Sequence, residues 1–201
     1  MSQRIVLATR NPHKVDELRR ILAEAGGPDV ELVSLADRPD VPDVAETGRT
    51  FVDNAVLKAT TVTSATGLPA IADDSGLSVD ALNGMPGVLS ARWAGRHGDD
   101  DANLALVLGQ LADVPDDRRT AAFVCAAALA APNGQIFVEE GRVRGRLVRE
   151  PRGTNGFGYD PIFVPDGETR TTAEMPSAEK DAISHRGRAL RALAPHLRML
   201  T

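Results

Sequence analysis

The sequence has very little cysteine, no long apolar run and no secretory signal pattern. Cys125 is the one cysteine among 201 residues, so no disulfide can form within the chain. That usage is typical of proteins in a reducing cytoplasm. No apolar run approaches the roughly 18 residues that a membrane-spanning helix needs, and the N-terminus does not have the pattern of a secretory signal. We therefore expect a cytoplasmic protein that has no membrane segment.

Excess positive charge is also missing, because the formal net charge is -5. Broad attraction to a nucleic-acid backbone is not expected at that charge, so we expect no nucleic-acid partner. An acidic protein can still bind a polyphosphate by concentrating cations in a pocket or by recruiting a metal. Lysine is scarce: Lys14, Lys58 and Lys180 are the only three. All three fall in the segments that carry the candidate chemistry.

The composition that remains is ordinary for a globular protein, with 42% hydrophobic and 25% charged residues. At this length we expect a single domain over residues 1–201, or two closely packed lobes that share a core. Hydropathy periodicity and capping residues predict strands at 4–8, 70–72, 77–79 and 121–130, an extended segment at 135–148, and helices from Pro12, at 51–65, at 102–112 and from Ser184. Strands and helices alternate early and a hairpin follows. The sequence therefore predicts an α/β fold with a mixed sheet flanked by helices.

The first candidate site is a strand-to-helix junction. Free backbone N–H groups and the positive end of the helix dipole meet there, which favours an anion. Thr9 and Asn11 can donate hydrogen bonds, and Lys14 adds a charge one turn into the helix. The segment reads Thr9-Arg10-Asn11-Pro12-His13-Lys14. It has no P-loop glycines, and the alternative is that Asn11 only caps the helix.

The second candidate is Asp73-Asp74-Ser75-Gly76, at the end of an apolar strand. Adjacent carboxylates repel each other unless they share a cation or a proton, and their oxygens are ligands that suit Mg²⁺. Successive strand residues point to opposite faces, so the two aspartates can serve one site only if a turn begins here. An ordinary Asp–Gly turn is the alternative. Glu46, Asn54 and Lys58 could add a carboxylate, a polar group and a balancing charge.

The third candidate is the glycine-rich loop 153–160, in which Phe157 lies between Gly156 and Gly158. A phenylalanine between glycines can expose its face to a flat ligand such as a base. The alternative is that Phe157 and Tyr159 fill the core.

The fourth candidate comprises Lys180 and Ser184-His185-Arg186-Gly187. Ser184 is a natural N-cap, which places His185 and Arg186 in the first turn, where cations oppose the helix dipole. A bound anion or an electronegative base edge would relieve that cost. A Ser/His/Asp nucleophilic triad is disfavoured because Ser75 has no nucleophile-elbow context.

In this order the segments resemble the inosine triphosphate pyrophosphatase family, also described as XTP/dITP pyrophosphatases. The matching motifs span almost the whole chain and form a specific set: Thr9-x-Asn11-x-x-Lys14, Glu46-Thr47-Gly48 with Phe51 and Asn54 to Lys58, Ala72-Asp73-Asp74-Ser75-Gly76, Ser90-Ala91-Arg92, Gly156-Phe157-Gly158-Tyr159-Asp160-Pro161 and Ser184-His185-Arg186-Gly187. Arg10 departs from the small residue often found at its position.

The resemblance implies an elongated fold with a long central sheet, two lobes with a nucleotide cleft between them, and a homodimer. It implies that Asp74 is the general base and a Mg²⁺ ligand, supported by Asp73 and Glu46. Thr9, Asn11 and Lys14 would hold the phosphates, and the neighbouring Arg10, Pro12 and His13 complete that segment. Ser75 would touch the substrate, and Phe157, with Gly158 and Tyr159 beside it, would stack on the base. Asp160, Lys180, His185 and Arg186 would bind the nucleoside, with Lys58, Asn54 and Arg92 as further candidates.

The implied activity is Mg²⁺-dependent hydrolysis of ITP, dITP or XTP to the monophosphate and pyrophosphate. Donors such as Arg186 would pair with an O6 acceptor and reject the amino group of adenine. Two other interpretations stay open. One is a pyrophosphatase for modified pyrimidine nucleotides, and the other is a nucleotide sensor without turnover.

Overall fold

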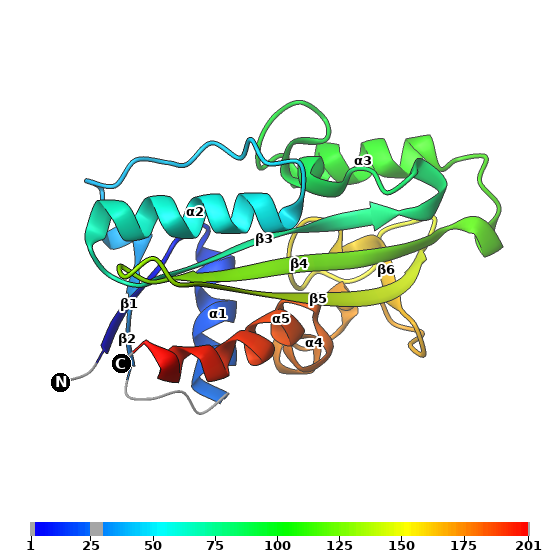
Figure 1. The fold of residues 1–201 in the computed structure, drawn as a ribbon. Helices are drawn as coiled ribbons and strands as arrows, with labels where there is room; N and C mark the ends of the chain where they lie inside the picture. Colours follow the sequence, from blue (N-terminus) through cyan, green and yellow to red (C-terminus); the bar gives the residue numbers. More distant parts are fainter. Residues whose placement is uncertain (1–2, 25–29, 201) are drawn as a thin grey trace. The chain divides into compact units, whose positions relative to one another are not determined.

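The computed structural model describes residues 3–24 and 30–200, apart from the side chains of Gln3, His13 and Glu24. It contains a six-stranded sheet in the order β2-β1-β3-β4-β5-β6 (Figure 1). The strands are β1 (Gln3–Leu7), β2 (Val30–Ser34), β3 (Ala70–Val79), β4 (Thr120–Ala130), β5 (Ile136–Leu147) and β6 (Phe163–Pro165). β1 runs parallel to β2 and β3, whereas β5 and β6 are antiparallel. The predicted mixed sheet is confirmed.

The α-helices are α1 (Pro12–Glu24), α2 (Phe51–Thr66), α3 (Asp100–Gln110), α4 (Ser177–Ile183) and α5 (His185–Leu193). Short 3-10 segments lie at Leu35–Asp37, Asp80–Leu82, Gly87–Arg92, Asp116–Arg118, Asp160–Ile162, Thr172–Glu174 and Ala194–Met199. None of the helices within residues 3–24 and 30–200 has the length and hydropathy to cross a membrane.

The chain divides into two compact units. Unit 1 comprises residues 1–74, 125–141 and 186–201, and unit 2 comprises residues 75–124 and 142–185. The bounds of β3, β4 and β5 show that these three strands each contribute residues to both units.

In unit 1, helices pack on both faces of the sheet (Figure 1). On one face α1 and α5 meet a cluster that includes Ile5, Leu7, Ile71, Cys125, Ala127 and Leu129. On the other face α2 meets Val6, Ala70, Ala72, Ala126, Ala128 and Ala130. Odd and even residues of each strand thus separate, as the two-residue period of a strand requires. The alanines of β4 belong to a strand that is buried on both sides, as the predicted strand at 121–130 requires.

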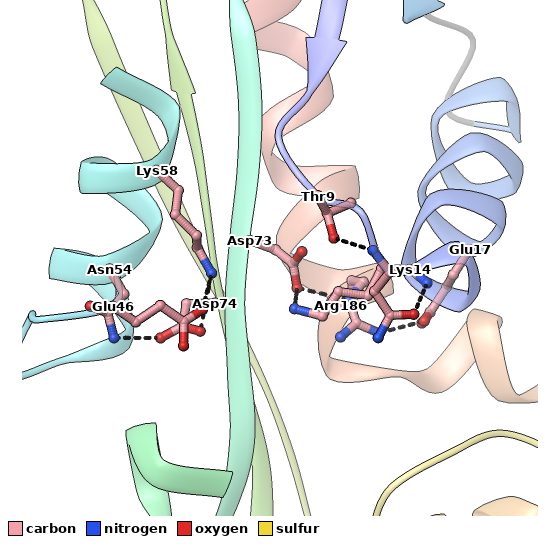
Figure 2. Close-up of polar contacts among 10 residues, drawn as sticks. Thr9, Lys14, Glu17, Glu46, Asn54, Lys58, Asp73, Asp74 and Arg186 are labelled. Atoms are coloured by element: carbon pink, nitrogen blue, oxygen red, sulfur yellow. Dashed lines mark hydrogen bonds and ion pairs between the residues drawn. The ribbon is translucent and has the colours of Figure 1, made fainter. Parts of the chain in front are cut away.

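This alternation decides where the tandem aspartates point. Ile71 lies on the face covered by α1 and α5, so Asp73 lies on that face too. Ala72 lies on the face covered by α2, so Asp74 points toward α2. Figure 2 shows the two carboxylates on opposite sides of β3. The faces that the helices cover thus decide which helix supplies the partners of each carboxylate.

Unit 2 has its own core, in which α3 packs on strand residues and on the end of the loop 153–160. Leu104 and Val107 of α3, and Leu111 directly after it, belong to the same buried cluster as Phe163 and Tyr159. Asp99 caps α3, since its side chain accepts a hydrogen bond from Ala102 N at 3.2 Å.

Two sequence-based expectations for these elements are wrong. The predicted turn at Asp73 is absent, because β3 runs without interruption from Ala70 to Val79. Gly76 serves close packing instead: a Cβ there would lie 2.3 Å from Ser90 Oγ. No strand was predicted between the helix from Pro12 and the helix at 51–65, but Val30–Ser34 form β2, which extends the sheet beside β1.

Candidate active site

Side chains from the first turns of α1 and α5 form an ion-pair network with Asp73 in unit 1 (Figure 2). Lys14 Nζ lies 2.9 Å from Asp73 Oδ2, and Arg186 Nε lies 3.0 Å from the same oxygen. Arg186 also donates to Glu17 through Nη1. Glu17 follows Lys14 by three residues, so both lie on the same side of α1. The network joins two cations and two carboxylates, and the side chain of Asp73 is fully buried.

Charge pairing keeps Asp73 and Arg186 ionised despite their burial. Burial alone would raise the pKa of Asp73, but Lys14 and Arg186 hold it well below the usual range of a carboxyl group. Burial would lower the pKa of Arg186, yet Glu17 and Asp73 raise it further above its ordinary value. Asp73 therefore stays a carboxylate throughout the physiological range and is a poor proton acceptor.

The strand-to-helix junction lies next to this network. Lys14 N lies 3.4 Å from Asn11 Oδ1, and Asn11 N donates to Thr9 Oγ1 at 3.2 Å, so Asn11 is at the helix start as predicted. Arg10 points elsewhere: it donates to Asp43 Oδ1 at 2.7 Å, to Leu35 O at 2.8 Å and to the carbonyl oxygen of Val41.

Arg10 thus binds the loop that leads to Glu46. Pro12 is exposed at the first position of α1. The side chain of His13 lies outside the described part of the chain.

On the opposite face of β3, Asp74 meets the groups that α2 and the preceding loop supply. Asn54 Nδ2 donates to Asp74 Oδ2 at 2.9 Å. Lys58 Nζ lies 3.3 Å from Asp74 Oδ1 and 2.7 Å from Glu46 Oε1, so one ammonium bridges two carboxylates. We call Asp74 and Glu46 the carboxylate pair.

The loop is fastened here too, because Gly48 N donates to Asn54 Oδ1 at 2.7 Å, and a Cβ on Gly48 would lie 2.5 Å from Asp53 Cβ. The capping box of Thr50 and Asp53 fixes where α2 begins and hence which side chains reach Asp74.

The electrostatics of Asp74 differ from those of its neighbour. Burial raises the pKa of Asp74, Lys58 opposes that shift, and Glu46 adds to it, so the net pKa is above the usual value. The pKa of Lys58 is also above its usual value. Burial lowers it, but the negative charges of Asp74, Asp73 and Glu46 raise it by more. A buried carboxylate with a raised pKa is the better proton acceptor of the tandem pair.

The carboxylate pair also fits the chemistry of a divalent cation. Two carboxylates that repel each other and supply hard oxygen donors suit Mg²⁺, which typically takes one or two protein carboxylates and completes its shell with water and phosphate oxygens. Within the described residues no group of three or more His, Cys, Asp or Glu side chains is placed to hold a metal ion. Protein ligands alone would thus leave most of the shell to water and substrate.

In unit 2 a second set of predicted residues surrounds the loop 153–160, which we call the Phe157 loop. Phe157 is half-buried, and its backbone N donates to Asp160 Oδ2 at 2.8 Å. Lys180 Nζ lies 2.6 Å from the same Asp160 oxygen and 5.3 Å from the centroid of the Phe157 ring. Tyr159 is buried in the core and donates to Ser90 O at 2.8 Å. Tyr159, rather than Phe157, fills the core.

The remaining candidates have distinct surroundings. His185 is buried and stacks on Phe123, with centroids 4.9 Å apart and an interplanar angle of 13°. Ser75 is half-buried on β3, directly after Asp74. Arg92, also half-buried, ends the 3-10 segment Gly87–Arg92. The hydroxyl of Ser90 in that segment accepts from Leu77 N at 2.9 Å, so the Ser90-Ala91-Arg92 motif is anchored to β3.

The face of β3 on which each aspartate lies decides its cationic partner. Lys14 contacts Asp73, and Asp74 lies on the other face of β3 because the strand does not turn. Asp73 thus meets Lys14 and Arg186, and its support of a metal site, which the resemblance implies, stays a prediction. Glu17 was not predicted from the sequence, although its spacing of three residues from Lys14 is a usable signal.

Comparison with known proteins gives agreement over nearly the whole chain. The model of the Ham1 family matches residues 5–196. The dITP/XTP pyrophosphatase of Streptomyces coelicolor is 61% identical over 197 residues, which is 98% of this chain and 98% of that protein. The protein of the same name from Corynebacterium efficiens is 57% identical over 198 residues, covering 96% of each chain.

Solved structures agree with these sequence relatives. The nucleoside-triphosphatase, dITP/XTP pyrophosphatase of Mycobacterium abscessus is 60% identical, with a TM-score of 0.78 over 96% of this chain and 100% of that one. A HAM1 protein from Coxiella burnetii is 43% identical, with a TM-score of 0.87 over 98% and 99% of the two chains.

Proposed function

The chain belongs to the Ham1 family, and on that premise we propose that it is a nucleoside triphosphate pyrophosphatase. Its substrates would be the non-standard purine nucleotides dITP, ITP and XTP, and its products the nucleoside monophosphate and pyrophosphate. Relatives about 60% identical over the full chain are named dITP/XTP pyrophosphatases. A role in removing such nucleotides from the pool follows from those substrates.

The observation that carries this proposal is the buried carboxylate pair. Asp74 is 5% exposed and has a raised pKa, and Lys58 bridges it to Glu46. A general base works best when its pKa approaches the working pH, so Asp74 is suited to take a proton from an attacking water. Asp73, beside it in sequence, is held ionised by two cations and is not.

Each residue then has a role that its surroundings support. Asp74 and Glu46 would hold Mg²⁺, which would offset the negative charge of the triphosphate when bound. Thr9, Asn11 and Lys14 at the start of α1 would bind phosphate oxygens through N–H and ammonium groups. Asp74 would accept the proton as the water oxygen attacks phosphorus and the link between the α- and β-phosphates breaks.

The Phe157 loop would bind the base. Phe157 would stack on the purine, and Lys180, whose ammonium has three donors and gives one to Asp160, could donate to an O6 acceptor. Adenine has an amino group in place of O6, so it would present a hydrogen-bond donor to the ammonium of Lys180. A buried donor left unpaired costs about 1–3 kcal/mol, so this clash would disfavour ATP.

A nucleotide panel tests the proposal. Purified protein is incubated with Mg²⁺ and ITP, dITP, XTP, GTP, ATP or dUTP, and monophosphate and pyrophosphate are measured together. We expect equal amounts of the two products from ITP, dITP and XTP, and far slower turnover of ATP. Release of orthophosphate with a diphosphate would contradict the proposed bond cleavage.

The same panel separates the alternatives from the sequence. Preferential hydrolysis of dUTP would favour a pyrimidine pyrophosphatase, and binding of ITP without product would favour a sensor. A homodimer and a cytoplasmic location remain part of the proposal. Light scattering after size-exclusion chromatography measures the first, and cell fractionation the second.

A further inference from the structure

We propose that Asp100, at the start of α3, is a positioning residue that fixes the Phe157 loop for stacking on the base. This inference rests on the proposed function, because the base is its ligand. Two carboxylates accept hydrogen bonds from consecutive backbone N–H groups of the loop. Asp160 Oδ2 accepts from Phe157 N at 2.8 Å, and Asp100 Oδ2 accepts from Gly158 N at 2.9 Å.

The two carboxylates differ in what they can fix. Asp160 is only three residues from Phe157 and belongs to the same turn. Asp100 is 58 residues from Gly158 in sequence and lies on a separate element. The bond from Asp100 therefore ties the loop to α3, whereas the carboxylate of Asp160 connects it to Thr172 and to Lys180 of α4.

The loop needs such a tie because its backbone is permissive. Phe157 lies between Gly156 and Gly158, which have φ angles of 80° and 61°. Glycine visits many conformations in an unrestrained loop, so holding an aromatic ring between two of them has an entropic cost. A ring fixed in advance loses less freedom when a base binds, and affinity rises accordingly.

The carboxylate of Asp100 is itself well supported. Asp100 is in the first turn of α3, where the helix dipole favours a negative charge. Leu104 and Val107 pack α3 into the core of unit 2, together with Tyr159 of the Phe157 loop. Asp100 is thus held on a rigid element whose position the core determines.

The test is the substitution Asp100→Ala with Asp101→Ala as the matched control. Asp101 is the next residue of the same helix turn and carries the same charge, and its side chain is exposed. For D100A we expect the KM for ITP to rise about three- to tenfold, the range that one net hydrogen bond of ~1 kcal/mol implies. We expect kcat to change less than twofold, and D101A to match the wild type.

Two further measurements separate positioning from a general structural effect. Inhibition by inorganic tripolyphosphate, which has no base, should be the same in D100A and the wild type. D100N keeps an acceptor oxygen and should recover most of the affinity. If D100A does not fold, as judged by circular dichroism, D100S replaces it in the test. The serine hydroxyl is too short to accept the hydrogen bond from Gly158 N, so D100S also loses that bond.

The results distinguish a failure of the role of Asp100 from a failure of the proposed function. An unchanged KM in D100A, or an equal rise in D100A and D101A, would overturn the role of Asp100 while the wild type remains an active pyrophosphatase. A wild type that binds ITP without hydrolysing it would instead overturn the proposed function. Calorimetric titration with ITP would then still compare D100A with D101A. A wild type that does not bind ITP would overturn both.

Discussion

At the scale of single residues, two adjacent aspartates have opposite properties because strand geometry places them on opposite faces. Asp73 meets Lys14 and Arg186, whereas Asp74 meets Asn54 and the ammonium of Lys58. The same type of side chain is therefore a fixed anion in one position and a candidate base in the next. Substitutions to asparagine keep the shape and separate the two roles.

For Asp74→Asn we expect kcat for ITP to fall by about two to four orders of magnitude, the contribution typical of a general base. Asparagine retains an acceptor oxygen toward Asn54, so nucleotide binding should remain. Pyrophosphate release measures the first quantity and calorimetric titration with a non-hydrolysable ITP analogue the second. Near-wild-type kcat would remove Asp74 as the base.

For Asp73→Asn we expect a loss of stability that depends on pH. The pKa of Asp73 is lower in the folded protein than the ~3.9 of an unfolded chain. Its carboxylate therefore stabilises the fold above about pH 4, and this contribution is lost as the pH falls through the folded pKa.

Urea unfolding at pH 7, 5 and 3.5 measures the difference between D73N and the wild type. The difference should be constant between pH 7 and 5 and narrow at pH 3.5. Asp16→Asn, an exposed site on α1, serves as the control. If the difference in unfolding free energy between D73N and the wild type widens at low pH, Asp73 does not have a lowered pKa in the folded protein.

At the scale of elements, local signals predicted the ends of helices better than the course of strands. The helix predicted at 51–65 is α2, which Thr50 and Gly67 bound, since a cap and a left-handed glycine act over a few residues. Gly76 beside two aspartates suggested a turn, but distant partners decide that region. Lys14, Arg186 and Lys58 neutralise the aspartates, and Ser90 packs on the glycine, none of which a local pattern contains.

The loop between β2 and α2 gives a prediction at this scale. Arg10 binds it at Leu35, Val41 and Asp43, and Glu46 follows shortly after. Arg10→Ala should free the loop, weaken the placement of Glu46, and raise the Mg²⁺ concentration for half-maximal activity about two- to tenfold, as expected for lost hydrogen bonds.

At saturating Mg²⁺ the KM of R10A for ITP should be unchanged. The control is Arg38→Ala, because Arg38 pairs only with the exposed Asp40 of the same loop among its described contacts. A raised KM at saturating Mg²⁺ would instead support the sequence-based assignment of Arg10 to the substrate.

At the scale of the whole molecule, the proposed roles divide between the two units. The residues assigned to the phosphates and to Mg²⁺ belong to unit 1, and those of the Phe157 loop belong to unit 2. The motifs that resemble those of the family indicated both sets from the sequence. The pairing inside each set was not predictable, since it depends on which faces of the sheet the helices cover.

This division predicts that the two ends of the substrate can be weakened separately. Phe157→Ala should raise the KM for ITP about tenfold or more, since stacking on an aromatic side chain contributes about 1–3 kcal/mol per base. It should leave inhibition by inorganic tripolyphosphate unchanged, because that inhibitor has no base. Phe157→Trp keeps a stacking surface and should retain most of the affinity. An unchanged KM in F157A, or equal weakening of ITP and tripolyphosphate, would contradict the assignment of the base to this loop.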